Sequence, residues 1–373
     1  MMKIDMNLVK QYEDLNDGYY HLLNDLIRYP DATIIIVWSM RGPGKTYSAL
    51  WESYYHKIPM VYIKRTNEDL QFIAGEVGDK DLSPLAPINR DKNTHLKMQM
   101  ITKGIAGFYN SEWDDEKNDY LPAGAPYSIG VSLNAIKSIK GYDASDAEWI
   151  LLDEFIPQVG EIVKKKEGEM LLDLYMTCQR DRLERGKDPQ KLILFANAEE
   201  ISTPITRTLE VVDDMAELNA SGKRYRYLAD RGILLHHITK EECTFMTEKS
   251  KKGIYKAMAG TDWAAKSFDG LFANNDFSCV KHQKVNGFTL YAGFTYYGKE
   301  YYVLIRNQRF YVCAIKVKGN APHYNLKKES EQKAFYANIV LMLQTATMQG
   351  RCTFDRYSLY DLITRYKKIY TIN

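Results

Sequence analysis

One stretch decides the predicted fold of this chain, Ser39-Met40-Arg41-Gly42-Pro43-Gly44-Lys45-Thr46. Residues 32–38, which precede it, are apolar and β-branched, as is typical of a buried parallel strand. Residues 47–57, which follow it, predict a helix. A strand, a glycine loop, Gly-Lys-Thr and a helix in this order are the arrangement of a P-loop. Ser39 departs from the usual G-x-x-x-x-G-K-[ST] pattern, because it stands where the first glycine belongs.

The residue types in this stretch suit the binding of phosphate. Gly42 and Gly44 let the backbone take conformations that a Cβ atom would block, so its N–H groups can face phosphate oxygens. The N-terminus of the following helix adds a partial positive charge. Lys45 is expected to reach the β- and γ-phosphates of a nucleotide, and the Thr46 hydroxyl to bind Mg²⁺. The alternative is a Gly-Lys-Thr that only opens a helix, and the flanking strand and helix argue against it.

Composition indicates a globular protein of a reducing compartment. Charged residues make up 26%, hydrophobic residues 45% and aromatic residues 12% of the 373 positions, which argues against disorder. The five cysteines are scattered and form no C-x-x-C pair, so we expect neither a zinc site nor a disulfide framework. No apolar run approaches the length that spans a membrane. We therefore expect a cytoplasmic protein with no membrane partner.

A second motif follows about a hundred residues later, Glu148-Trp149-Ile150-Leu151-Leu152-Asp153-Glu154-Phe155. Four apolar residues that end in Asp-Glu are the Walker B pattern, and a buried strand would hold Asp153 at the carboxyl edge of the sheet. Asp153 is the predicted ligand of the Mg²⁺ that Thr46 contacts, and Glu154 the residue that polarises the attacking water. Asp-Glu at a strand end is often only a turn, but the two motifs together are far more specific than either.

Other polar residues follow predicted elements, and each has a plain structural alternative. Lys64 and Arg65 end a strand at 60–63 and could reach phosphate or DNA, although charges at a strand exit are more often solvated. Asn197 follows a strand at 192–195, where it would sense hydrolysis near the γ-phosphate or simply terminate the strand. Arg180 and Arg182 lie near the end of a helix predicted over 167–185. Cations suit a helix C-terminus, but an arginine there could also act on a neighbouring subunit's nucleotide.

Together these motifs resemble the DNA-packaging ATPases, or encapsidation proteins, of φ29-type bacteriophages, which are related to the ATPases of terminase large subunits. That family shows an R-G-x-G-K-[ST] loop, as at 41–46, and an apolar strand that ends in D-E-F, as at 153–155. It also shows an R-x-R helix end, like Arg180 and Arg182, about a dozen residues before a strand that ends like Ala196-Asn197-Ala198. The resemblance covers most of the chain and is most specific over 41–198.

The resemblance implies the role of each matching residue. The loop residues that would bind ATP are Arg41, Gly42, Pro43, Gly44, Lys45 and Thr46. Thr46 and Asp153 would hold Mg²⁺, and Glu154 would be the catalytic glutamate. Arg180 would act in trans, Asn197 would couple hydrolysis to movement, and Lys140 resembles a lysine at the subunit interface.

The resemblance also implies partners and a location. The active assembly would be a ring, pentameric in that family, that acts on double-stranded DNA and docks on the capsid's portal (connector) protein. Whether a packaging RNA takes part stays open. The protein would work in the host cytoplasm and transiently at the portal vertex of the procapsid.

The C-terminal part predicts a separate domain with a basic surface. Residues 288–295, 300–305 and 310–317 predict three strands of an antiparallel meander, followed by a helix at 329–349, a strand at 351–355 and a helix at 358–368. This is the order of an RNase H-like domain, as in the nuclease of terminase large subunits. The predicted first strand contains no acid, however, and a two-metal nuclease needs several carboxylates. From residue 281 onward, 15 Lys/Arg against five Asp/Glu give a net charge of +10, which suits the phosphates of DNA or RNA.

The predicted organisation is therefore an α/β chain with three parts. Residues 1–247 would form a P-loop (ASCE-type) ATPase domain with a mainly parallel sheet, 248–276 a small linker domain, and 277–373 an RNase H-like vestigial nuclease domain that binds nucleic acid. The predicted function is an ATP-hydrolysing motor that packages viral DNA, without nuclease activity. The alternatives are a nuclease-competent terminase large subunit, an ATP-dependent switch that binds nucleic acid without translocating it, and a small-molecule P-loop kinase.

Overall fold

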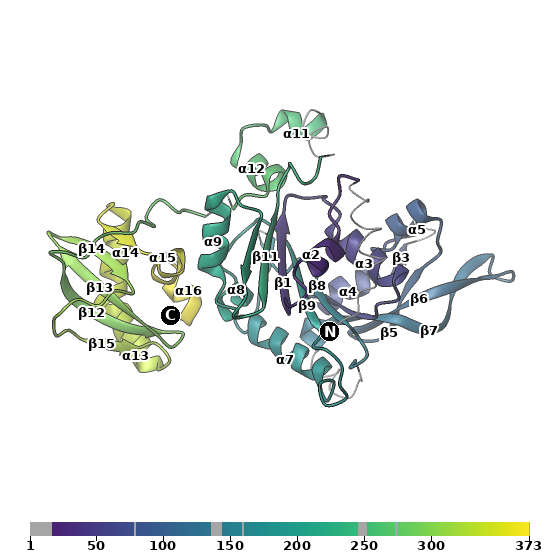
Figure 1. Ribbon diagram of the computed structural model, residues 1–373, viewed down its shortest axis with the longest axis horizontal. Coiled ribbons are helices and arrows are strands. Elements are labelled where there is room, and N and C mark those ends of the chain that lie inside the picture. Colours follow the sequence, from purple (N-terminus) through teal and green to yellow (C-terminus); the bar gives the residue numbers. More distant parts are fainter. Residues whose placement is uncertain are drawn as a thin grey trace. The chain divides into compact units, whose positions relative to one another are not determined.

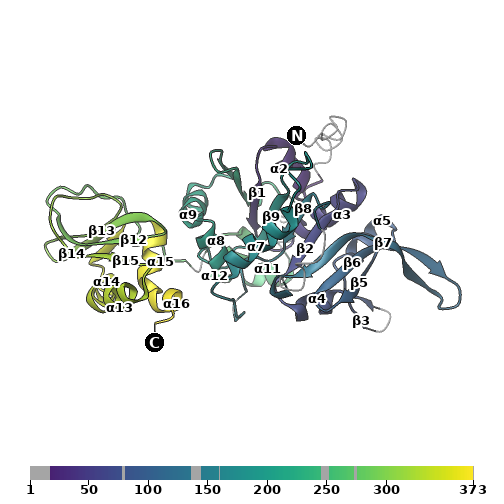
Figure 2. The ribbon, with the colours of Figure 1, turned by 90° about the horizontal axis from the view of Figure 1, so that it is seen from below.

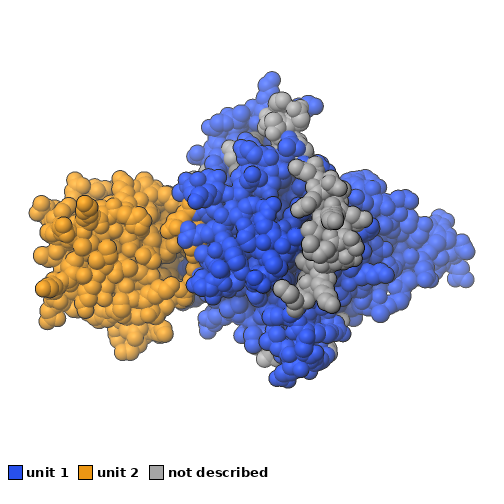
Figure 3. Space-filling model, viewed as in Figure 1, with its two compact units in different colours: residues 1–209, 218–274 blue, residues 210–217, 275–373 orange. Residues whose placement is uncertain are grey.

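The computed structural model describes residues 17–77, 80–135, 144–158, 160–244, 252–272 and 275–372. The chain divides into two compact units, which are coloured separately in Figure 3. The first comprises residues 1–209 and 218–274, and the second 210–217 and 275–373. Most of the segment expected as a linker domain, 248–276, thus clusters with the first unit. The three-part division stays a prediction.

A nine-stranded sheet forms the centre of the first unit, in the order β10-β11-β1-β9-β8-β2-β7-β6-β5. Its strands are β1 (Ile34–Ser39), β2 (Met60–Lys64), β5 (Lys97–Thr102), β6 (Ile105–Asp114), β7 (Asp119–Ser132), β8 (Trp149–Leu152), β9 (Lys191–Asn197), β10 (Tyr225–Leu228) and β11 (Ile233–Ile238). Neighbours from β11 to β7 are parallel, whereas β10, β6 and β5 add antiparallel pairs at the edges. The prediction of a mixed α/β fold with a large, mostly parallel sheet is confirmed.

The central strands are apolar because both faces of the sheet are covered. β8 is buried at every position, as is β1 after its first residue. On one face, side chains of β1, β2, β8 and β9 pack into a single core with Leu26 of α2 (Leu22–Arg28), Leu50 of α3 (Lys45–Tyr55) and Leu70 of α4 (Asn67–Ile73). In register, Ser39 at the end of β1 pairs with Asn197 at the end of β9. The carboxyl ends of these strands therefore meet at one edge.

Two helices differ from the prediction. The amphipathic pattern of residues 6–29 predicts an N-terminal helix, but residues 6–16 lie outside the described part, and α2 begins only at Leu22. The helix predicted over 167–185 ends six residues early, because α7 (Glu167–Gln179) stops where Arg180 takes a φ of 38°. An α-helix cannot continue through a positive φ, so residues 180–186 form turns instead.

The sequence of residues 96–108 predicts a hairpin, which is confirmed as the β5–β6 pair. β6 then continues and forms a second hairpin with β7, which pairs as far as Asp114 and Asp119. Figures 1 and 2 show the β6–β7 hairpin extending beyond the rest of the sheet in both views. Further helices among the described residues of this unit are α5 (Ala86–Lys92), α8 (Pro204–Thr208), α11 (Gly253–Ala257) and α12 (Asp262–Asp269).

A buried charged cluster ties residues near α2 to the edge strands. The His236 ring lies 2.7 Å from Asp25 Oδ2 through Nδ1 and 3.0 Å from Glu242 Oε2 through Nε2. The Tyr20 hydroxyl donates to the same Asp25 oxygen at 2.9 Å, and the Tyr225 ring stacks on the imidazole. Burial lowers the pKa of His236, but the carboxylates of Asp25 and Glu242 outweigh it and raise this pKa to about 9.

The second unit contains a five-stranded sheet in the order β15-β12-β13-β14-β16. β12 (Thr289–Tyr296), β13 (Lys299–Arg306) and β14 (Arg309–Cys313) form the predicted antiparallel meander. β15 (His323–Asn325), which the sequence did not indicate, runs parallel to β12, and β16 (Cys352–Phe354) runs parallel to β14. The helices are α13 (Glu329–Phe335), one π-helical turn (Tyr336–Val340), α14 (Leu341–Met348), α15 (Tyr357–Thr364) and α16 (Tyr366–Tyr370).

Residues 210–217 belong to the second unit through a specific contact. They begin α9 (Val212–Ser221), where the Asp213 carboxylate accepts hydrogen bonds from the Ser358 N–H at 2.8 Å and from its hydroxyl at 2.7 Å. Among the described residues of the whole chain, no helix is both long enough and apolar enough to cross a bilayer.

Candidate active site

The glycine loop joins β1 to α3 as predicted. Gly42 has a φ of 88° and Gly44, the N-cap of α3, a φ of 93°. Both values lie in the region that favours glycine. A Cβ at Gly44 would lie 3.4 Å from the Tyr19 ring, an ordinary contact, so the backbone conformation and not a lack of space calls for glycine there. The two glycines are therefore required by the backbone of this loop, whatever it binds.

Ser39 fits its position because that position needs no glycine. It is the last residue of β1, pairs in register with Asn197 and Ile238, and has no positive φ. Its hydroxyl donates to the Met40 carbonyl at 2.6 Å and accepts from Lys45 Nζ. The departure from the usual glycine thus supplies an oxygen that holds the lysine.

Lys45 is a buried cation whose hydrogen-bond partners are neutral. Its side chain donates to Ser39 Oγ and, at 3.4 Å, to Asn197 Oδ1. Only 8% of its surface is exposed. Burial lowers the pKa of Lys45 to about 8, although the nearby Asp153 carboxylate raises it. A buried ammonium whose acceptors are neutral is suited to bind an anion.

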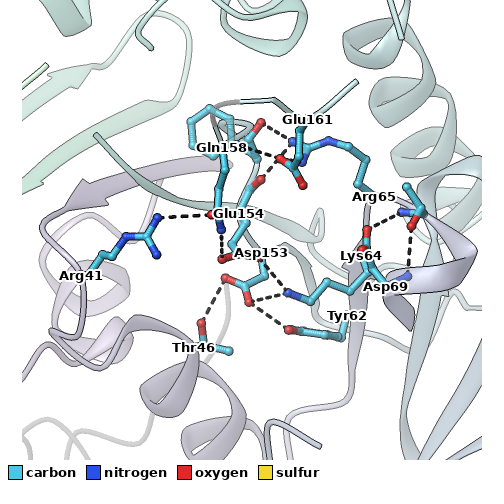
Figure 4. Close-up of polar contacts among 12 residues, drawn as sticks. Arg41, Thr46, Tyr62, Lys64, Arg65, Asp69, Asp153, Glu154, Gln158 and Glu161 are labelled. Carbon is cyan, nitrogen blue, oxygen red and sulfur yellow. Dashed lines mark hydrogen bonds and ion pairs between the residues drawn. The ribbon is translucent and has the colours of Figure 1, made fainter. Parts of the chain in front are cut away.

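The two sequence motifs meet at this edge of the sheet (Figure 4). Thr46 Oγ1 donates to Asp153 Oδ1 at 3.1 Å, across 107 positions of sequence. The second oxygen of Asp153 accepts from the Tyr62 hydroxyl at 2.9 Å and from Lys64 Nζ at 3.2 Å. Asp153 is therefore fixed by donors on both oxygens and by its place directly after β8.

Glu154 takes a left-handed backbone conformation, with a φ of 56°. Its carboxylate is held on both sides, because Lys64 Nζ lies 3.4 Å from Oε2 and Gln158 Nε2 lies 3.4 Å from Oε1. The Gln158 carboxamide oxygen in turn accepts from Arg41 at 3.3 Å. Arg41 also lies 3.7 Å from a Glu199 carboxylate oxygen.

Lys64 and Arg65 are not solvated, so the interpretation of these charges as a solvated strand exit was wrong. Lys64 sits between Asp153 and Glu154. Arg65 is 7% exposed and donates to the carbonyl oxygens of Glu154 at 3.0 Å and Phe155 at 2.9 Å. A sequence signal for this placement exists, because two consecutive cations end one strand and Asp-Glu follows another. It becomes informative only once the two strands are known to be neighbours in the sheet.

Arg65 also binds the segment that leads into α7. Its guanidinium pairs with Glu161 at 2.9 Å and with Glu167, in the first turn of α7, at 2.7 Å. One side chain thus links the loop that carries Glu154 to the helix that ends before Arg180.

The two arginines after α7 have different environments. Arg182 is 1% exposed and donates to the carbonyl oxygens of Ser145 at 2.7 Å and Ala147 at 3.1 Å, and it also pairs with Glu148. Arg180 is exposed and adopts a φ of 38° with a ψ of −125°. Arg182 therefore stabilises residues 145–148, which lead into β8, whereas Arg180 is an exposed residue. Lys140 lies outside the described residues.

The glycine loop, Asp153, Glu154 and the end of β9 surround a pocket of about 220 Å³. Its lining comprises Gly42, Pro43, Gly44, Lys45, Thr46, Tyr47, Asp153, Glu154, Ala196 and Asn197. Within the part of the chain that the structure describes, no group of three or more His, Cys, Asp and Glu side chains is arranged to hold a metal ion by itself. The site thus combines a glycine loop, a buried lysine and two adjacent carboxylates at the carboxyl edge of a parallel sheet, where α/β proteins bind ligands.

Two solved structures share this fold over nearly the whole chain. The Phi-28 gp11 DNA packaging motor aligns with a TM-score of 0.60 at 14% identity, over 96% of this chain and 99% of that chain. The bacteriophage Phi-29 viral genome packaging motor assembly aligns with a TM-score of 0.62 at 16% identity, over 95% and 100%. No protein-family model matches the chain, and neither does any curated protein. The fold is therefore that of the φ29-type packaging motors, which confirms the resemblance predicted from the motifs.

Proposed function

We propose that this chain is the ATP-hydrolysing subunit of a motor that moves double-stranded viral DNA into a preformed procapsid. The observation that carries this proposal is the 3.1 Å contact between Thr46 and Asp153 beside the buried Lys45. This contact joins the two motifs of a P-loop ATPase in one pocket, in a chain with the fold of two phage packaging motors.

The residues present fit ATP and Mg²⁺. Lys45 faces the pocket with neutral acceptors, so a phosphate would give this buried cation an ionic partner. Thr46 and Asp153 offer two adjacent oxygens of the kind that Mg²⁺ prefers, and would hold the ion. When bound, Mg²⁺ supplies charge neutralisation on the phosphates. Arg41, Gly42, Pro43 and Gly44 would complete the nucleotide site.

Each remaining residue has a proposed role in hydrolysis. Glu154 would orient the attacking water and accept its proton. Asn197, whose amide oxygen lies 3.4 Å from Lys45 Nζ, would report the state of the phosphates to β9. Arg180 would reach the nucleotide of a neighbouring subunit, which requires a ring, pentameric by analogy with the φ29-type family. Lys140 is a further candidate at that interface.

The second unit is proposed to bind DNA through its phosphates. Basic side chains on its surface include Lys281, Lys284, Arg306, Arg309, Lys316 and Lys318, all of which are exposed. Contacts of this kind give affinity without sequence preference. Bounds of 1–247, 248–276 and 277–373 for an ATPase, a linker and an RNase H-like domain remain part of this proposal. The portal protein, and possible packaging RNA, remain proposed partners at the procapsid.

We do not expect this unit to cut DNA. β12 contains no Asp or Glu, and Asp355, the acid that follows β16, is 7% exposed and engaged by its neighbours. Its carboxylate accepts from Arg356 at 3.0 Å and from the Ala314 N–H at 3.0 Å. Asp213 lies near enough to Asp355 to interact with it electrostatically, but its carboxylate is bound by Ser358. Within the described residues these acids belong to no group of three or more that could hold metal ions, as a two-metal site requires.

Steady-state ATP turnover of the wild type and Glu154→Gln, each with and without double-stranded DNA and portal protein, tests the proposal. We expect turnover that DNA stimulates and that the variant loses. Nucleotide-dependent DNA binding without stimulated turnover would favour a switch, and Mn²⁺-dependent DNA cutting would favour a nuclease-competent terminase. Turnover that is indifferent to DNA even on the portal would reopen the small-molecule kinase alternative.

A further inference from the structure

The two carboxylates that follow β8 share one cation from the neighbouring strand. Lys64, the last residue of β2, lies 3.2 Å from Asp153 Oδ2 and 3.4 Å from Glu154 Oε2 through the same Nζ atom (Figure 4). Only 13% of the Lys64 side chain and 10% of the Asp153 side chain are exposed. Solvent therefore screens this ion pair far less than it screens a surface salt bridge.

Lys64 places a positive charge beside the Glu154 carboxylate and also donates a hydrogen bond to it. Lys64 donates to one oxygen of this carboxylate, and the Gln158 amide donates to the other at 3.4 Å. A general base must have its carboxylate within hydrogen-bond reach of the water that it activates. The Glu154 side chain is 45% exposed and each of its oxygens can accept a second hydrogen bond, so water still reaches it, but the two protein donors fix the direction in which the carboxylate points.

The Lys64 ammonium also binds Asp153, the predicted ligand of Mg²⁺. A divalent ion held by Thr46 and Asp153 would lie close to the Lys64 ammonium. Two positive charges that are close together in a buried site repel each other strongly. Tyr62 contacts the same Asp153 oxygen at 2.9 Å but is neutral, so it does not oppose a metal ion in this way.

We propose that Lys64 is a positioning residue that holds Asp153 and Glu154 in a resting arrangement and competes with Mg²⁺ for Asp153. This inference rests on the proposed function of the site. With metal and nucleotide bound, Lys64 would leave Asp153 and in the same movement withdraw the donor from Glu154 Oε2. Metal loading and release of the catalytic carboxylate are thereby one event, which keeps an incompletely loaded site inactive.

The test measures Mg²⁺-dependent binding, with the full chain, of a fluorescent ATP analogue that is not hydrolysed. In Lys64→Met and Lys64→Gln the competing charge is absent, so we expect half-maximal binding at a Mg²⁺ concentration 3- to 10-fold lower than in the wild type. Tyr62→Phe is the matched control, because it removes a neutral donor to the same oxygen; its midpoint should shift less than twofold. Lys64→Arg keeps the charge and should stay close to the wild type.

Two results would overturn the inference. An unchanged Mg²⁺ midpoint, with or without a lower melting temperature, would mean that the ion pair only stabilises the fold. Weaker binding of the analogue at saturating Mg²⁺ without a lower midpoint would mean that Lys64 binds phosphate instead. Since a destabilised variant does not gain Mg²⁺ affinity, the expected result cannot arise from misfolding. A wild type that binds no analogue at any Mg²⁺ concentration would overturn the proposed function, and this inference with it.

Discussion

The backbone at Arg180 separates its proposed role in catalysis from the stability of the fold. A φ of 38° with a ψ of −125° is the mirror image of extended backbone, which glycine adopts readily. For a residue with a Cβ, such a conformation costs on the order of 1–3 kcal/mol. Arg180→Gly and Arg180→Ala both lose the side chain and every contact that it makes. They differ only in the Cβ and in the freedom of the unfolded chain.

The expected difference follows from these two terms. Relief of backbone strain favours the glycine variant, and its greater unfolded-state entropy opposes this by about 0.4–1 kcal/mol. We therefore expect urea unfolding to show Arg180→Gly more stable than Arg180→Ala by about 1 kcal/mol. Both variants should bind nucleotide normally, yet lose DNA-stimulated turnover in the assembled ring by roughly a thousandfold or more if the guanidinium acts in trans. The glycine variant would thus be the more stable of the two and still inactive.

Arg182→Ala is the control with the opposite behaviour. Arg182 is 1% exposed, and its removal leaves the Ser145 carbonyl without its donor, whereas the Ala147 carbonyl keeps the Gln190 amide and Glu148 is 36% exposed. We expect a loss of about 1–3 kcal/mol of unfolding free energy. The reasoning is refuted if the glycine variant is no more stable than the alanine variant, or if Arg182→Ala unfolds like the wild type. Normal turnover of Arg180→Gly in the ring would refute the trans role alone.

Three further predictions concern the glycine loop, β9 and the buried histidine. Ser39→Gly should bind nucleotide within about threefold of the wild type, whereas Gly44→Ala, strained at a φ of 93°, should bind at least about tenfold more weakly in a titration; equal affinities would contradict this. Asn197→Ala should change nucleotide affinity by less than about threefold, since its contact with the lysine is long, but should reduce the ratio of turnover with DNA to turnover without it; an unchanged ratio would remove its coupling role. Because the pKa of His236 is raised to about 9, its contribution of roughly 3 kcal/mol is complete below pH 6.5 and lost as pH rises through 9, a slope in unfolding free energy that His236→Gln should abolish.

Local sequence determined the elements of this protein and the loop chemistry. Runs such as 34–39 and 149–152 are apolar because both faces of the sheet are buried, and this signal needs no knowledge of the partner strand. Gly42 and Gly44 are required by their own φ values. The chemistry of the P-loop, the Asp-Glu strand end and the meander of the second unit could therefore be predicted from residues within short windows.

Only the tertiary structure decided which charged side chains point into the site. Lys64 and Arg65 looked like a solvated strand exit. Arg65 is buried and the Lys64 side chain only 13% exposed, because β2 pairs with β8 and so brings them against Asp153 and Glu154. Sequence could not distinguish Arg180 from Arg182, because that difference depends on where α7 ends and on three residues before β8 that bind Arg182. Strand order and helix ends result from contacts between distant segments, and a local sequence pattern does not encode which distant segment will supply the partner.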